Sequence, residues 1–243
     1  LPAQNPADTS CCRRMITRWL SRFLQPRCIG CGRAAVVGLC DDCAARLPHL
    51  GIHCPTCANG VANARFACGT CLRRPPAYSR LLVRWQFRDV VRSTILRGKF
   101  YADRCALRVL EDETCRLLHA HPVQVDAVLA MPIANRRLHQ RGFNQTLFSA
   151  RAAARLLGVP LVAEGVFHKE GRAPQSLLPT HAARRRNIRG AFAVRDTLPA
   201  RLLLVDDVVT SGATLHEAAR ALRAAGVQDV VALAIAAAHR GTS

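Results

Sequence analysis

The sequence predicts an α/β fold, a mostly parallel sheet flanked by helices, preceded by a small cysteine-rich module. From residue 77 onward, apolar segments of strand length alternate with longer segments of helical spacing, which is typical of a parallel sheet covered on both faces. Before them, between residues 28 and 71, four Cys-x-x-Cys pairs follow one another. Half of the 243 residues are apolar and 21% are charged, which is the composition of a globular protein.

The four cysteine pairs predict two zinc sites. A tetrahedral zinc site needs four ligands, and each Cys-x-x-Cys turn delivers two thiolates to one point. A redox role suits one such pair beside a βαβ unit rather than four in a row. We expect sequential pairing, first pair with second and third with fourth, although crossed pairing stays open. The expected ligands are Cys28, Cys31, Cys40, Cys43, Cys54, Cys57, Cys68 and Cys71.

These features divide the chain into three predicted segments: a tail with a short amphipathic leader at residues 1–27, a double zinc-ribbon module at 28–74, and an α/β domain at 77–240. Pro75 and Pro76 mark the second boundary, because proline continues neither a helix nor a strand ladder. The leader carries large apolar residues on one side, which favours a docking helix over contact with a membrane surface.

Charge and hydropathy limit the class of protein. The net charge of +19 points to a polyanion or to nucleotide phosphates as ligands. All but Lys99 and Lys169 of the 35 basic residues are arginines, so genomic base composition is an alternative explanation. The sequence has no apolar run of about 18 residues and no secretory signal pattern. We therefore expect a cytoplasmic protein without an integral membrane segment, with contact at the inner face of the cell membrane left open.

The elements of the α/β domain follow from apolar periodicity and from glycine and proline boundaries. Apolar segments of strand length are expected to form strands at residues 81–87, 125–132, 161–168, 191–194, 201–207 and 229–238. Segments of helical spacing are expected to form helices at residues 89–100, 102–120, 145–158 and 214–226.

The stretch LLLVDDVVTSGAT carries the strongest chemical signal. Ligands of such sheets bind at the carboxyl ends of the strands, where two acids follow LLLV. Paired carboxylates suit a sugar diol or a magnesium-bound sugar phosphate, and a loop of small and hydroxyl residues opening a helix suits a phosphate. A strand-end turn with a helix cap is the alternative. The residues expected at this ribose 5-phosphate site are Asp206, Asp207, Thr210, Ser211, Gly212, Ala213 and Thr214.

The same stretch resembles the phosphoribosyl pyrophosphate (PRPP) signature of type I phosphoribosyltransferases. In chain order, WLSRFLQPRCIGCG, the double Cys-x-x-Cys module, ILRGKF, MPIANRRLHQRGFNQ and RRNIRGAF resemble the ComF/GntX family over about residues 19 to 238. The resemblance implies a zinc ribbon joined to a phosphoribosyltransferase-like domain. It also implies Mg²⁺ with PRPP or a related ribose phosphate, and a role in natural competence, with single-stranded DNA and competence-machinery proteins as partners.

The resemblance also implies roles for single residues. Asp206 and Asp207 would hold the ribose hydroxyls, and residues 210–214 the 5-phosphate. Arginines in two segments are candidates for the diphosphate or for DNA, because the forked guanidinium suits phosphate; a solvated basic loop is the alternative for the second segment. These arginines are Arg136, Arg137 and Arg141, and Arg184, Arg185 and Arg186. Lys99 matches a family Lys-Phe pair and has no assigned role.

Two functions remain in competition. A ComF-like protein would handle incoming single-stranded DNA in the cytoplasm and bind a ribose phosphate. An active Mg²⁺-dependent phosphoribosyltransferase would instead transfer the ribosyl group of PRPP in nucleotide or nucleoside metabolism. The sequence identifies no catalytic residue and no group that would recognise a particular base, so it favours the first function and leaves catalysis open.

Overall fold

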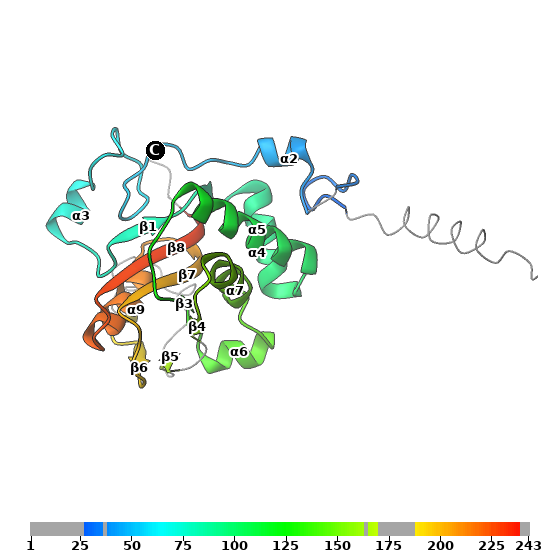
Figure 1. Ribbon diagram of the computed structural model, residues 1–243. Coiled ribbons are helices and arrows are strands. Elements are labelled where there is room, and N and C mark those ends of the chain that lie inside the picture. Colours follow the sequence, from blue (N-terminus) through cyan, green and yellow to red (C-terminus); the bar gives the residue numbers. More distant parts are fainter. Residues whose placement is uncertain (1–26, 36–37, 163–164, 170–187, 239–243) are drawn as a thin grey trace, which may run out of the picture.

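A parallel sheet forms the centre of the computed structural model, which describes residues 27–35, 38–162, 165–169 and 188–238 (Figure 1). Its strand order is β1-β8-β7-β3-β4, and β2 also pairs with β8. All these pairings are parallel, as the alternating pattern predicts. The strands are β1 (Arg80–Leu82), β2 (Trp85–Gln86), β3 (Ala127–Ala130), β4 (Leu161–Val162), β7 (Arg201–Val209) and β8 (Asp229–Ala237).

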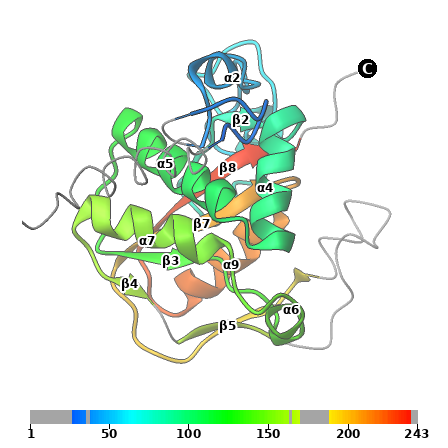
Figure 2. The same ribbon diagram turned by 90° about the vertical axis from the view of Figure 1, so that its right-hand side faces the viewer.

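Helices cover both faces of the sheet. One face carries α4, α5 and α7, and the other carries α9 together with a small antiparallel pair, β5 and β6 (Figures 1 and 2). The covering elements are α4 (Asp89–Tyr101), α5 (Arg104–Ala120), α7 (Thr146–Leu157), α9 (Ala213–Ala224), β5 (Val166–His168) and β6 (Phe192–Val194). The short helices are α2 (Asp41–Ala45), α3 (Gly69–Arg73) and α6 (Asn135–Arg141).

The central strand β7 shows why this sequence gives this fold. Leu202 and Leu204 belong to the core beneath α9, whereas Leu203 and Val205 belong to the core beneath the three helices on the opposite face. Successive side chains of a strand point to opposite faces, so a strand buried on both sides is apolar at every position. The run LLLV is therefore the signature of a central parallel strand, and the predicted fold class is confirmed.

Two predicted strands are interrupted. The segment 81–87 divides into β1 and β2, and between them the carbonyl of Arg84 accepts a hydrogen bond from the N–H of Leu50 in the cysteine module. The segment 161–168 divides into β4 and β5 on either side of Gly165, whose φ of +86° turns the chain away from the sheet. The first interruption leaves both strands in the central sheet, whereas the second leaves β4 in the central sheet and β5 in the antiparallel pair.

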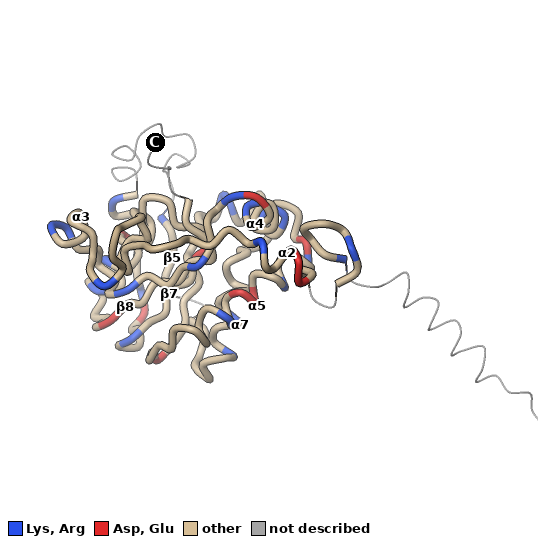
Figure 3. The backbone as a smooth tube through the Cα atoms, turned by 90° about the horizontal axis from the view of Figure 1, so that it is seen from above, with Lys and Arg blue, Asp and Glu red and all other residues tan. Residues whose placement is uncertain are grey.

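Some expectations concern parts of the chain outside the described residues. They are the amphipathic leader within residues 1–26 and the second arginine segment with Arg184, Arg185 and Arg186. In the described part of the chain, no helix has both the length and the apolar character needed to cross a membrane. Lys and Arg positions are spread over several elements, including α3 and α4 (Figure 3).

Candidate functional site

The acid pair lies near the carboxyl end of β7, as predicted. Asp207 is 7% exposed and Asp206 is half-buried. Two backbone hydrogen bonds of 2.8 Å fix their carboxylates: the N–H of Asp207 donates to Oδ1 of Asp206, and the N–H of Val208 donates to Oδ1 of Asp207. The second oxygen of Asp207, Oδ2, is left to face other elements.

Lys99 and Gln145 converge on that oxygen from two helices. Lys99, in the last turn of α4, places its Nζ 3.3 Å from Oδ2 of Asp207. Gln145, which precedes the first residue of α7, donates from its Nε2 to the same oxygen at 2.7 Å. Lys99 belongs to RGKF, Gln145 to RGFNQ and Asp207 to VDD. Three segments that are distant in sequence therefore meet at one carboxylate.

This arrangement shifts the pKa values of the two carboxyl groups in opposite directions. Burial and the charge of Asp207 raise the pKa of Asp206 from 3.8 to about 8. Burial also disfavours the charged form of Asp207, but the Lys99 ammonium and the hydrogen bonds from Gln145 and Lys99 outweigh it, so the pKa of Asp207 is lowered. Lys99 and Gln145 therefore favour the negative charge of the pair on Asp207, and burial favours the protonated form of Asp206.

The loop after β7, for which the sequence predicts phosphate binding, leads into a glycine-capped helix. Gly212 caps α9 with a φ of +69°, a left-handed conformation that favours glycine. A Cβ added there would lie 3.2 Å from Oη of the buried Tyr78. The first turn of α9 begins at Ala213 and presents backbone N–H groups that have no partner within a helix. Thr210, Ser211 and the first turn are thus gathered at one end of the sheet.

The arginines of the first segment belong to α6, a short helix that the sequence pattern does not predict. Arg141 is half-buried, and its guanidinium carbon lies 5.1 Å from the centre of the Phe100 ring. Burial and the neighbouring Arg137 lower the pKa of Arg141, while the charge of Asp207 opposes them. Arg141 therefore lies near Asp207 and beside Arg137, whereas Arg136 is exposed on the same helix.

The eight cysteines form two groups with sequential pairing. In each group the sulfur atoms all lie within 4.8 Å of one another. A tetrahedral Zn²⁺ with Zn–S bonds of about 2.3 Å holds its sulfurs about 3.8 Å apart. The distances from Cys31 to Cys40 and from Cys57 to Cys68 are both 3.7 Å between sulfurs, so both groups fit the ion. Each group could therefore hold one metal ion, consistent with zinc.

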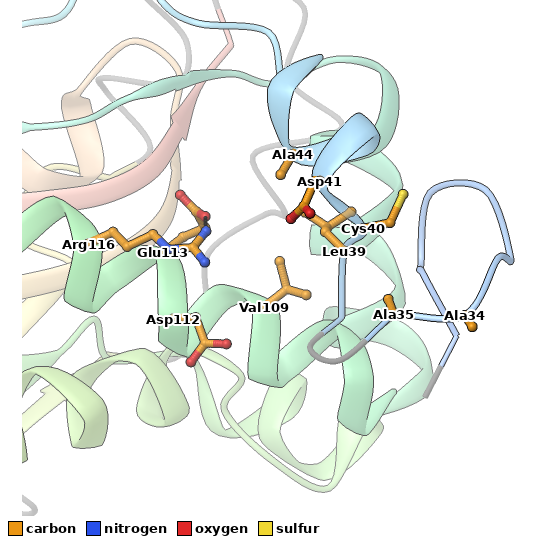
Figure 4. Close-up of a pocket in the computed structure, with 10 residues that line it drawn as sticks. All are labelled: Ala34, Ala35, Leu39, Cys40, Asp41, Ala44, Val109, Asp112, Glu113 and Arg116. Carbon is orange, nitrogen blue, oxygen red and sulfur yellow. Dashed lines mark hydrogen bonds and ion pairs between the residues drawn. The ribbon is translucent and has the colours of Figure 1, made fainter. Parts of the chain in front are cut away.

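The two cysteine groups contact different parts of the α/β domain. The first borders a pocket of about 370 Å³ between the cysteine module and α5 (Figure 4). Carboxylates of Asp41, Asp112 and Glu113 line this pocket beside Arg116, so it suits a cation better than a phosphate. The second group lies close to Tyr78: burial raises the pKa of its hydroxyl, and the charges of the second group raise it further.

Sequence reasoning missed two members of the site. Gln145 was part of the recognised RGFNQ segment, but nothing in a linear pattern shows which amide reaches a distant carboxylate. Tyr78 stands just after the predicted linker and joins the core beneath α9, where its hydroxyl approaches Gly212. Both residues reach the site through tertiary contacts, which the local spacing of residues in the sequence does not predict.

Comparison with known proteins agrees with this geometry. A family model described as phosphoribosyl transferase domain matches residues 147–243, a span that includes the acid pair and the loop. The solved structure of adenine phosphoribosyl transferase from Trypanosoma brucei is 13% identical and covers 57% of this chain and 68% of its own, with a TM-score of 0.29. The fold class rests instead on the parallel sheet and on the match to the family model.

Three curated relatives extend the likeness to the cysteine module. Competence protein F of Haemophilus influenzae is 27% identical over 223 residues, which are 87% of this chain and 96% of the relative. DNA utilization protein YhgH of Escherichia coli strain K12 is 28% identical over 199 residues, 79% of this chain and 87% of the relative. Competence protein ComFC of Bacillus subtilis is 25% identical over 192 residues, 76% and 77% of the two chains.

Fold and site together define a protein with a phosphoribosyltransferase-type domain and a cysteine-rich N-terminal module. The relatives named competence protein F and ComFC, joined to that domain, support its assignment to the ComF family, as the sequence motifs predict.

Proposed function

We propose that this ComF-like protein binds PRPP or a related ribose phosphate with Mg²⁺ and acts in DNA uptake by handling incoming single-stranded DNA in the cytoplasm. One observation carries the ligand: an acid pair near the carboxyl end of β7 is followed at once by a glycine-capped helix start. Carboxylates there suit the ribose hydroxyls, and the first turn of α9 suits the 5-phosphate.

The residues present fit a magnesium complex. Mg²⁺ prefers oxygen ligands and is usually held by one or two carboxylates together with substrate phosphates. Asp206 offers a carboxylate near the carboxyl end of β7, while Lys99 already neutralises Asp207. When bound, the ion would supply charge neutralisation for the diphosphate, a role that Arg137 and Arg141 would share from α6.

Calorimetric titration of PRPP with Mg²⁺ into zinc-loaded protein tests the site. We expect saturable binding that Asp206→Asn and Asp207→Asn each weaken by at least about tenfold, equivalent to about 1.4 kcal/mol. Asp112→Asn is the matched control, because Asp112 lies on α5 at the other pocket and pairs with the exposed Arg108. A folded wild type that binds neither PRPP nor ribose 5-phosphate would contradict this part of the proposal.

The DNA role is supported by the names of the relatives and by charge. Competence protein F and DNA utilization protein YhgH are relatives over most of their length, and the chain carries a net charge of +19. In the part of the chain that the structure describes, basic positions occur on several elements, including α3 and α4 (Figure 3). The backbone of a nucleic acid would be held by such arginines through phosphate contacts.

Equilibrium binding of a labelled single strand at several salt concentrations tests direct DNA contact. We expect the logarithm of the affinity to fall linearly with the logarithm of the salt concentration, because bound phosphates release counterions. An absence of binding near physiological salt would remove DNA contact from the proposal and leave competence-machinery proteins as the partners to be sought.

Arg141 favours one alternative, an active phosphoribosyltransferase. Its guanidinium, close enough to Asp207 to affect its own ionisation, would stabilise a departing pyrophosphate. Pyrophosphate release from PRPP, measured across a panel of bases and amines, tests this function. Pyrophosphate release that occurs with one acceptor and is abolished by Arg141→Met would establish the enzyme. An absence of release with every acceptor would exclude transfer to the acceptors in that panel.

A further inference from the structure

We propose that Phe100 and Tyr101, at the end of α4, form a stacking platform for the bases of single-stranded DNA. Arg137 and Arg141 of α6 would hold the adjoining phosphates. The inference deepens the proposed DNA role and rests on it, because it names the side chains that would contact the strand. It places this contact beside the acid pair, since the neighbouring residue Lys99 reaches that pair.

Two large aromatic side chains are exposed in succession at the end of α4. Phe100 is 57% exposed and Tyr101 is 78% exposed. In the part of the chain that the structure describes, the other exposed aromatic residue is Phe66, in the cysteine module. Single exposed apolar residues are common on protein surfaces, whereas a contiguous pair of large rings is the kind of exposure that marks a binding surface.

The turn that presents the two rings is closely fixed. Ala102 ends α4 at a φ of +50°, a left-handed conformation that costs energy in a residue with a Cβ. The N–H groups of Ala102 and Asp103 both donate to the carbonyl of Arg97, and Nε of Arg97 donates to Oδ2 of Asp103 at 2.8 Å. Backbone strain of this kind is found mainly at functional sites, and here it follows directly after the exposed rings.

A cation already covers one face of the Phe100 ring. The guanidinium carbon of Arg141 lies over the ring, 5.1 Å from its centre. Aromatic faces attract cations, so this contact holds the ring in a defined orientation. More than half of Phe100 nevertheless stays exposed, which leaves the ring open to a second planar group.

The arginines beside the platform suit the phosphates of a strand. Arg137 lies one helical turn before Arg141 on α6. Neither arginine forms an ion pair with a described residue, whereas Lys99 is paired with Asp207. The two arginines are also the candidates for the diphosphate, so a strand and PRPP would compete for them.

Single-stranded DNA matches both features of this surface. Each nucleotide brings one planar base and one phosphate, and proteins that bind single strands combine aromatic rings for the bases with cations along the backbone. Rings and cations in this combination bind a strand without regard to its sequence, because every base has a π-face. The platform therefore predicts general rather than sequence-specific binding.

Fluorescence anisotropy of a labelled single strand, titrated with full-length zinc-loaded protein in the absence of PRPP, tests the platform. Phe100→Ala should weaken binding by about 5- to 150-fold, the range for losing one base–aromatic stack. Phe100→Trp should keep the affinity, because an indole also stacks on a base. Phe66→Ala is the matched control: it removes a ring that is 69% exposed on the cysteine module and should leave the affinity unchanged.

A strand with abasic sites shows whether the rings contact bases. Removing the bases should weaken binding by the wild type much more than binding by a double variant, Phe100→Ala with Tyr101→Ala, because the variant has no ring left to stack. The slope of the logarithm of affinity against the logarithm of salt concentration should stay the same in Phe100→Ala. In Arg137→Met the slope should become shallower by about one phosphate contact.

Equal affinities of the wild type and Phe100→Ala for the intact strand would overturn the platform and leave the DNA role to the arginines. If Phe100→Ala did not fold, Tyr101→Ala would decide in the same way. No binding by the wild type at any salt concentration would overturn both the platform and the DNA role. Sedimentation that showed a wild-type dimer and a Phe100→Ala monomer, with unchanged DNA affinity, would assign the rings to a second copy of the chain instead.

Discussion

The indole Nε1 of Trp85 donates a hydrogen bond of 2.9 Å to Oε2 of Glu113. Glu113 is 4% exposed, and its other oxygen accepts from Nη1 of Arg116 at 2.6 Å. The ring of His49, from the cysteine module, lies 4.4 Å from the Trp85 ring between centroids. The pair therefore joins β2, α5 and the cysteine module at the wall of the acidic pocket.

Replacing this buried carboxylate should destabilise the protein. Glu113→Met leaves the Trp85 N–H buried without an acceptor, so we expect the free energy of unfolding to fall by about 1–3 kcal/mol. Glu113→Gln keeps a carbonyl acceptor for the indole and should lose much less. Chemical denaturation of both variants, with zinc present, measures the difference; equal losses would show that charge rather than the hydrogen bond matters.

Removing the two metal ions separately should have different effects on the ligand site. Cys31→Ser and Cys57→Ser should each lower the zinc content from about two ions to about one per chain. Only Cys57→Ser should also weaken PRPP binding, because the second group lies close to Tyr78, whose hydroxyl approaches Gly212 of the phosphate loop. Metal analysis and calorimetry provide the measurements, and equal losses of affinity in the two variants would argue against this link.

The sequence predicted those features of the structure that depend on local residue patterns. Alternation of strands and helices gave the parallel sheet, because β7 is buried on both faces and so reads as LLLV. The spacing of the Cys-x-x-Cys pairs predicted the two groups of four cysteines. Helix α6 was missed because Asn135–Arg141 carries arginines instead of an apolar stripe, and the interruption of residues 81–87 depends on a hydrogen bond from Leu50.

The meeting of Lys99, Gln145 and Asp207 could not be predicted in the same way. Lys99 and Gln145 lie 108 and 62 positions from Asp207 along the chain. Which side chains reach the end of β7 depends on how α4 packs on α5 and how α7 is tied to β3. A linear motif records the residues that such packing requires, such as RGKF and RGFNQ, but not what they touch.

Glycine at position 212 should matter for binding as well as for stability. Gly212→Ala forces alanine into a left-handed conformation at a φ of +69°, which costs about 1–2 kcal/mol, and brings its Cβ against Oη of Tyr78. Gly158→Ala is the matched control: Gly158 has a φ of +66°, and a Cβ there meets nothing within 4 Å.

Both glycine variants should therefore unfold at lower denaturant concentration, by similar amounts. Only Gly212→Ala should weaken binding of PRPP and of ribose 5-phosphate, because both ligands carry the 5-phosphate expected at α9. Calorimetry with the two ligands checks this. Full affinity in Gly212→Ala would place the 5-phosphate elsewhere.

The acid pair should make stability depend on pH in a direction opposite to that of an ordinary ion-paired carboxylate. The folded pKa of Asp206 is raised from 3.8 to about 8, so within that window the folded chain holds a proton that the unfolded chain has released. The free energy of unfolding contributed by this group therefore falls as pH rises from 3.8 to about 8. The free energy of unfolding contributed by Asp207 instead rises with pH, and it does so only at acid pH, because the pKa of Asp207 is lowered.

Asp206→Asn removes the titrating group while keeping its shape, so its stability advantage over the wild type should be larger at about pH 8 than at about pH 6. Asp207→Asn should be less stable at both values, because it leaves the Lys99 ammonium beside a neutral group. Denaturation of the ligand-free, zinc-loaded proteins at the two pH values measures these differences. A stability advantage of Asp206→Asn that did not grow with pH would mean that Asp206 is already ionised at neutral pH, and Lys99 would then neutralise a pair with two charges.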